Sequence, residues 1–97
     1  MVTKQRIVEF EWDEGNIDKS YQKHGISPNE AEEIFLDKKL KIEKDVKHSQ
    51  EEERLIAFGK TNAGKILFVV FMMRDKKIRV ISARITNLKE RRRYEKT

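Results

Sequence analysis

An unbroken apolar segment is the feature that most restricts how this chain can fold. Residues 66–73 are Ile-Leu-Phe-Val-Val-Phe-Met-Met, without one polar side chain. A strand with a solvated face alternates apolar and polar residues, whereas a strand covered on both faces is apolar throughout. A membrane-spanning helix needs about 20 apolar residues and is excluded. The segment therefore predicts a central strand of a sheet, with both faces covered or with one face left for a partner.

The length and composition limit what can surround that strand. The 97 residues suffice for one domain, so we expect a single domain over residues 1–97 and no separate cofactor-binding domain. The chain has no cysteine, which excludes disulfides, thiolate metal sites and cysteine nucleophiles. No signal-peptide core follows the N-terminus, and no segment is long enough to span a membrane. We therefore expect a cytoplasmic protein without a cofactor.

The residues before the apolar segment predict a strand, two helices and an edge strand. Residues 8–12 alternate apolar and acidic side chains, as in a half-buried strand. A first helix is expected over residues 13–25. The sequence Ser-Pro-Asn-Glu at residues 27–30 has the pattern of a capping box with proline at the first helical position, which predicts a second helix. Leu40 and Ile42 alternate with lysines, and these charges are typical of an edge strand.

The residues around and after the apolar segment predict two further strands and a last helix. Strands are expected at 54–61 and 78–85, with a hairpin turn at 62–64. Thr86 or Asn87 is expected to cap the last helix, and Glu90, three residues after Asn87, gives a second signal like a capping box. The fold class is therefore α+β: a mostly antiparallel sheet with two N-terminal helices on one face and a short basic C-terminal helix. Strict alternation along 78–85 places Arg84 on one sheet face, with Ile78 and Val80, and Arg79 on the other.

The positive charge is concentrated at the end of the chain. Residues 1–73 hold 12 Lys and Arg against 14 Asp and Glu, whereas residues 74–97 hold 10 against 3. Guanidinium groups bind phosphate oxygens, so this distribution favours nucleic acid as a ligand, although a solvated tail is the alternative. We expect Arg79 and Arg84 to hold phosphate in the reacting site. The other predicted phosphate ligands are Arg54, Lys89, Arg91, Arg92 and Arg93.

Cleavage of RNA requires a base for the 2'-hydroxyl, an acid for the leaving 5'-oxygen and cations for the phosphate. His24 and His48 are the two possible imidazole proton carriers. Their alternatives are a helix C-terminal cap for His24 and an exposed loop residue for His48. Glu53, Glu90 and Tyr94 would orient these groups or react directly, unless they serve only in ordinary salt bridges. The two histidines and the glutamates lack metal-ligand spacing, so no metal site is expected.

Several segments together resemble one known family in order and spacing. Arg-Val-Ile-Ser-Ala-Arg at residues 79–84, followed by Glu-Arg-Arg-Arg-Tyr-Glu at 90–95, is the most specific pair. With Phe-Glu-Trp-Asp at 10–13, Lys-His-Gly at 23–25 and the residues around 48–54, they resemble the BrnT toxins of type II toxin-antitoxin modules. The resemblance extends from about residue 8 to residue 95, which is nearly the whole chain.

This resemblance implies a RelE-like fold and a ribonuclease that inhibits translation and growth. It implies a BrnA-type antitoxin with a ribbon-helix-helix DNA-binding domain, often with two toxins on an antitoxin dimer. The complex would repress its own operon, so the toxin would reach operator DNA only through the antitoxin.

Metal-independent RNA cleavage is therefore the primary hypothesis. The alternatives are a nucleic-acid-binding module without catalysis, and an interaction subunit whose main role is to bind an antitoxin.

Overall fold

The computed structural model describes residues 9–12, 24–48 and 52–96. The first predicted helix therefore falls almost entirely outside the described residues, and α2 is the N-terminal helix that can be compared with the prediction. The elements in chain order are β1 (Glu9–Trp12), α2 (Pro28–Glu33), the 3-10 turn η2 (Ile34–Leu36), β2 (Lys41–Lys44), the 3-10 turn η3 (Val46–His48), β3 (Leu55–Lys60), β4 (Ile66–Arg74), β5 (Lys77–Ile85) and α3 (Leu88–Glu95).

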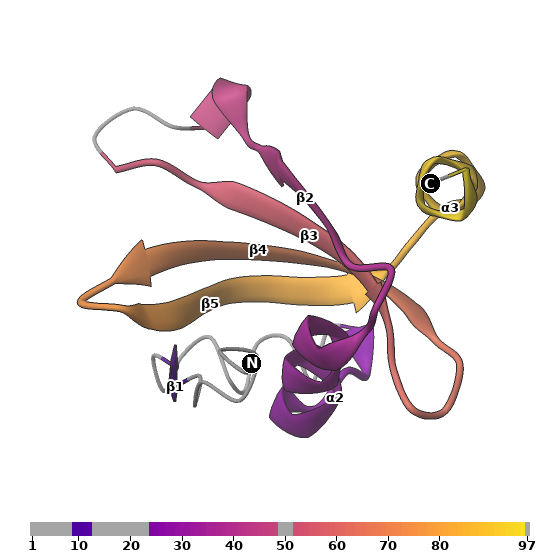
Figure 1. Ribbon diagram of the computed structural model, residues 1–97, viewed down its shortest axis with the longest axis horizontal. Helices are drawn as coiled ribbons and strands as arrows, with labels where there is room; N and C mark the ends of the chain where they lie inside the picture. The colour runs from indigo at the N-terminus through magenta and orange to yellow at the C-terminus, as the bar shows by residue number, and fades with distance from the viewer. Residues whose placement is uncertain (1–8, 13–23, 49–51, 97) are drawn as a thin grey trace.

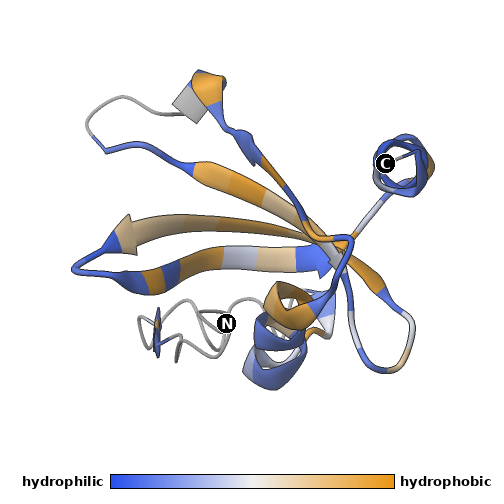
Figure 2. Ribbon diagram, viewed as in Figure 1, coloured by the Kyte–Doolittle hydropathy of each residue, from blue (hydrophilic) through white to orange (hydrophobic). Residues whose placement is uncertain are grey.

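The described strands form one sheet in the order β1-β5-β4-β3-β2. The apolar strand β4 lies at its centre, as its sequence predicts, and β2 is an edge strand. Only β1 pairs in parallel, with β5, so the predicted mostly antiparallel sheet is confirmed. In Figure 1, α2 lies against the sheet, while α3 lies beyond the end where β5 finishes. In Figure 2, apolar colour concentrates in the central strands and α3 is mostly polar.

Both described α-helices begin with the capping boxes that the sequence predicts. The Ser27 hydroxyl accepts from the Glu30 amide, and the Glu30 carboxylate accepts from the Ser27 amide. Asn87 and Glu90 repeat this arrangement at the start of α3. Each box satisfies backbone donors that a helix start leaves unpaired, and it thereby fixes where the helix begins.

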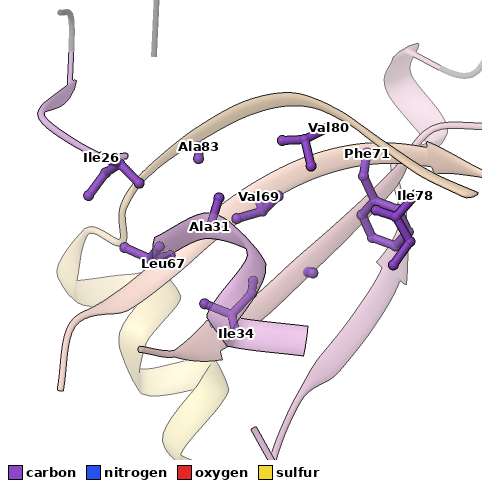
Figure 3. Packing of buried hydrophobic residues seen from close by; sticks show 10 residues of the cluster. Ile26, Ala31, Ile34, Leu67, Val69, Phe71, Ile78, Val80 and Ala83 are labelled. Carbon is purple, nitrogen blue, oxygen red and sulfur yellow. The ribbon is translucent and has the colours of Figure 1, made fainter. Parts of the chain in front are cut away.

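The main core lies between α2 and the sheet. Ala31 and Ile34 pack against Leu67, Val69 and the neighbouring apolar side chains of β5 (Figure 3). η2 lies so close to β3 that a Cβ at Gly59 would come within 2.7 Å of the Ile34 Cβ and 2.9 Å of the Ile34 carbonyl oxygen. Glycine is therefore required at this contact.

A β-bulge in β5 changes which residues share a face. Ser82 pairs with Val70, but Val80 pairs with Phe71, so Ile81 is an extra residue in β5. Ile78, Val80 and Ala83 consequently all belong to the core on the α2 side. The prediction that Arg84 shares a face with Ile78 and Val80 is therefore wrong. A bulge shifts the alternation by one residue, and it brings Arg84 to the same face as Arg79.

Candidate nucleic-acid interface

The sheet face opposite α2 collects arginines over an apolar floor. We call it the arginine face, and the register places these side chains on it: Arg54, Ile56, Phe58, Phe68, Val70, Met72, Arg79, Ser82 and Arg84. The assignment follows from alternation, because Leu67, Val69 and Phe71 of β4 belong to the α2-side core. The intervening β4 residues must point the other way.

One end of the arginine face carries two arginines beside Met72. Arg79 is the β5 partner of Met72. Leu55 pairs with Phe71, so Arg54, the preceding residue, comes level with Met72 on the other side. Arg79 is the cross-strand partner of Glu11 in β1, with an Nη1 to Oε1 distance of 3.7 Å. Phe10 and Trp12 pack on the α2-side core, which leaves Glu11 on the arginine face.

The other end is built on two phenylalanines. The ring centroids of Phe58 and Phe68 are 5.5 Å apart in an edge-on arrangement. The Arg84 Cζ lies 4.0 Å from the Phe68 centroid, and the Arg93 Cζ lies 5.6 Å from the Phe58 centroid. Arginines from β5 and α3 therefore meet over one aromatic pair, at cation–π distance.

The two ends are about 13 Å apart, because Met72 and Phe68 are separated by four residues of β4. Val70, with its partners Ile56 and Ser82, forms the floor between them. The arginine face thus carries cations at both ends of a strip whose apolar side chains Val70 and Met72 are each only 9% exposed. Cations spaced in this way suit the phosphates of a single strand of nucleic acid, and the planar groups at the aromatic end suit its bases.

Carboxylates also accompany the two arginines at the aromatic end. The two Nη atoms of Arg84 donate to the two carboxylate oxygens of Glu90, each at 2.8 Å. The hydrogen bonds from Arg84 lower the pKa of Glu90, and the same bonds raise the pKa of Arg84. Arg93 pairs with Glu43 of β2. Glu90 is therefore ionised and fully engaged at neutral pH.

The two histidines lie in different parts of the fold. His24 comes two residues before Ile26, which is in the α2-side core, so its backbone belongs to the other side of the sheet. His48 ends η3. The Asp45 amide, just before η3, donates to the Arg54 carbonyl at 2.8 Å, so the turn starts beside the arginine face. Figure 1 shows η3 toward the end of the sheet where β3 begins, away from α3.

Glu53 and Tyr94 do not lie at the end of the arginine face that carries Arg79. Glu53 is 3.7 Å from Lys44, whose strand partner Leu55 belongs to the α2-side core. Tyr94 is buried, and its hydroxyl donates to Asp37 at 2.5 Å. Burial and this hydrogen bond raise the pKa of Tyr94 to about 12. In the structure Tyr94 attaches α3 to the rest of the protein.

The remaining basic residues of α3 face outward. A shallow hollow of about 590 Å³ is lined by Leu88, Lys89, Arg92, Arg93 and Lys96. Arg91 is exposed on the same helix. The predicted phosphate ligands thus divide between the arginine face and the outer surface of α3.

The interface residues that were not predicted include its apolar floor and also Glu11, Glu43, Phe68 and Ser82. The alternation of residues 8–12 contained a signal for Glu11, since it set the glutamates opposite the apolar side chains. No comparable signal existed for Phe68, because every neighbour in its strand is equally apolar. Within the described residues, no three His, Asp or Glu side chains are grouped to hold a metal ion, and no helix could cross a membrane.

Comparisons with known proteins bear directly on this interface. Residues 12–90 match the family model described as the ribonuclease toxin BrnT of type II toxin-antitoxin systems. The chain belongs to the BrnT family. The match includes Arg54, Arg79 and Arg84, and with them both ends of the arginine face. Membership in a type II toxin-antitoxin family implies an antitoxin partner.

A solved BrnT structure has the same fold. The 1.1 Å crystal structure of the Brucella abortus ribonuclease toxin BrnT is 26% identical, with a TM-score of 0.65 over 84% of this chain and 99% of that one. A comparison with curated protein sequences gave no match. The family and the structural likeness agree with the α+β fold described above.

Proposed function

We propose that this BrnT-family chain is an endoribonuclease that cleaves RNA on the arginine face without a metal ion. The observation that carries the proposal is the bulge at Ile81, because it brings Arg79 and Arg84 to one side of the sheet. In a regular strand that kept Ile81 in the pairing, the two guanidinium groups would face opposite sides, and no single RNA strand would contact both.

Arg54 and Arg79 would hold the reacting phosphate. They flank Met72, and a phosphate oxygen would compete with the Glu11 carboxylate, 3.7 Å away, for the Arg79 guanidinium. Two arginines at one phosphate neutralise the charge that develops as the 2'-oxygen attacks. The O2'–P bond forms and the P–O5' bond breaks, which leaves a cyclic phosphate and a 5'-hydroxyl.

His48 is the proton carrier that the fold favours, because η3 starts beside Arg54. It would take the proton of the 2'-hydroxyl or supply one to the 5'-oxygen, since an imidazole can do either. Glu90 and Tyr94 act as positioning residues in this proposal. Glu90 is engaged by Arg84, and Tyr94 keeps its proton at neutral pH.

The proposed partner is a BrnA-type ribbon-helix-helix antitoxin, in a complex of two toxins on an antitoxin dimer. The complex would repress its operon through the antitoxin, and free toxin would inhibit translation in the cytoplasm. Type II family membership supports the existence of an antitoxin. Co-expression of a BrnA-type protein should restore growth of cells that express the chain.

The test is incubation of the purified protein with end-labelled RNA in excess EDTA. The wild-type protein should cleave, and Arg79→Ala should cleave about a hundredfold more slowly, as expected for loss of one charge-stabilising donor. Lys38→Ala is the matched control, because Lys38 is an exposed cation in the turn after η2. Loss of cleavage in EDTA alone would contradict metal independence. Intact RNA under conditions of binding would favour a non-catalytic RNA-binding module.

A further inference from the structure

Glu90 and the Ile85 carbonyl engage three of the five N–H donors of the Arg84 guanidinium group. Nη1 donates to Glu90 Oε1 and Nη2 to Glu90 Oε2, each at 2.8 Å, and Nη1 also lies 3.3 Å from the Ile85 carbonyl oxygen. Glu90 is held in turn, since Oε1 accepts the Asn87 amide in the capping box of α3. A phosphate that took the fork of Arg84 would have to displace a bidentate partner that is fixed by the helix start.

The guanidinium plane of Arg84 is supported from one side by an aromatic ring. One side covers Phe68 at 4.0 Å, and Phe68 rests against Phe58. The Arg84 side chain nevertheless remains 35% exposed, compared with 15% for Glu90. Glu90 holds one edge of the group and Phe68 covers one surface, so neither of these partners covers the opposite, outer surface. A planar cation held in this way is a partner for a nucleobase, because bases stack on arginine planes as they do on aromatic rings.

We propose that Arg84 is a base-stacking platform whose Nη1–Nη2 fork is held by Glu90. One nucleobase of a single-stranded RNA stacks on the outer surface of its guanidinium group. The strand then runs past Ser82 toward the phosphate held by Arg54 and Arg79, about 13 Å away. This inference rests on the proposed function, and it defines where a base is recognised in that site.

A short 2'-O-methyl RNA oligonucleotide, which has no free 2'-hydroxyl and is not cleaved, is the probe. Binding is measured for the full oligonucleotide and for a series in which each position in turn lacks its base. The wild-type protein should bind about tenfold more weakly when one particular base is missing. Arg84→Lys keeps the charge next to Glu90 and removes the plane. It should bind the full oligonucleotide about tenfold more weakly and should be insensitive to loss of that same base.

Arg79→Ala is the comparison for a phosphate contact. It should stay sensitive to the missing base, and the slope of log affinity against log salt should become shallower by about 0.7. Arg84→Lys should leave that slope unchanged. Wild-type affinity in Arg84→Lys, or an equal loss for the full and base-free oligonucleotides, would overturn the stacking role.

Two further outcomes separate this inference from the proposed nuclease. If the wild type cleaves natural RNA but a missing base affects wild type and Arg84→Lys equally, the stacking role is refuted and the nuclease proposal stands. If Arg84→Lys is insensitive to the missing base but the wild type does not cleave, the nuclease proposal is refuted and the stacking role stands. If Arg84→Lys does not fold, the base-free series with the wild-type protein decides. A loss of affinity confined to one position supports the platform, and equal affinity at every position overturns it.

Discussion

The Tyr94 hydroxyl donates a hydrogen bond to the Asp37 carboxylate at 2.5 Å, and so connects α3 to the turn that follows η2. Asp37 also accepts the backbone amides of Lys39 and Lys60. One carboxylate thus joins the N-terminal helical layer, β3 and α3. Since Tyr94 packs with Phe58 and Ile66, this contact also positions α3 next to the aromatic end of the arginine face.

Tyr94→Phe removes this hydrogen bond and leaves the packing in place. We expect the free energy of unfolding to fall by about 1.5–3 kcal/mol, the range for a hydrogen bond to a charged partner. Urea denaturation at neutral pH measures the loss. The RNA cleavage rate of the folded variant should stay close to that of the wild type, because Tyr94 acts through position in our proposal. A large loss of rate with unchanged stability would instead place its hydroxyl in the reaction.

Acid should destabilise the protein through three carboxylates. Burial raises the pKa of Asp37, but hydrogen bonds from Tyr94 and from the Lys39 and Lys60 amides outweigh it, so the net pKa lies below 3.8. Hydrogen bonds from Lys65 and Ser27 lower the pKa of Glu30, and those from Arg84 lower the pKa of Glu90, both relative to 4.5. Depressed pKa values give stability that is present above the unfolded-state values and is lost as the pH falls through the folded-state values.

The unfolding free energy should therefore be constant near neutral pH and decline below about pH 4.5. Urea titrations at a series of pH values measure this decline. Asp37→Asn should start from a lower stability at neutral pH and decline less in acid. A parallel decline in Asp37→Asn and wild type would show that Asp37 contributes nothing to the acid sensitivity.

The hairpin between β4 and β5 contains an avoidable strain. Asp75 and Lys76 have φ values of 53° and 67°, which side chains with a Cβ rarely adopt. Lys76→Gly creates Asp-Gly, a favoured pair for this class of two-residue turn, and should raise the unfolding free energy by about 1 kcal/mol. Lys44→Gly in β2 is the control and should lower it by about 0.5–1 kcal/mol, because φ is not positive there. Thermal unfolding of the two variants separates these directions.

Deletion of Ile81 tests the bulge itself. Without Ile81, Val80 still faces α2, and Ser82 and Arg84 still belong to the arginine face, so regular alternation is restored without reversing any side chain. We expect a folded protein that still binds RNA. Deletion of Val69 from β4 is the matched control, since it reverses every later β4 residue and should prevent folding. Circular dichroism melting and RNA binding compare the two, and equal disruption would contradict the assignment of the bulge.

Local signals predicted much of this fold. The capping residues at 27–30 and 87–90, the turn at 62–64 and the apolar strand at 66–73 each specify their element within a few residues. The bulge lacked such a signal, because Ile81 is an ordinary strand residue and its exclusion from pairing depends on the whole sheet. The Arg93–Glu43 and Tyr94–Asp37 contacts join residues 50 and 57 positions apart, and only the assembled tertiary structure reveals them.

Glu90 has two duties, since it closes the capping box of α3 and holds Arg84 above Phe68. A change that disturbs the start of α3 should therefore also disturb Arg84 at the aromatic end of the arginine face. Selection for variants that no longer inhibit growth should therefore recover substitutions at Asn87 as well as at Arg84, although Asn87 would not contact the substrate. In such a screen, a residue that only caps a helix would be found together with residues that bind RNA.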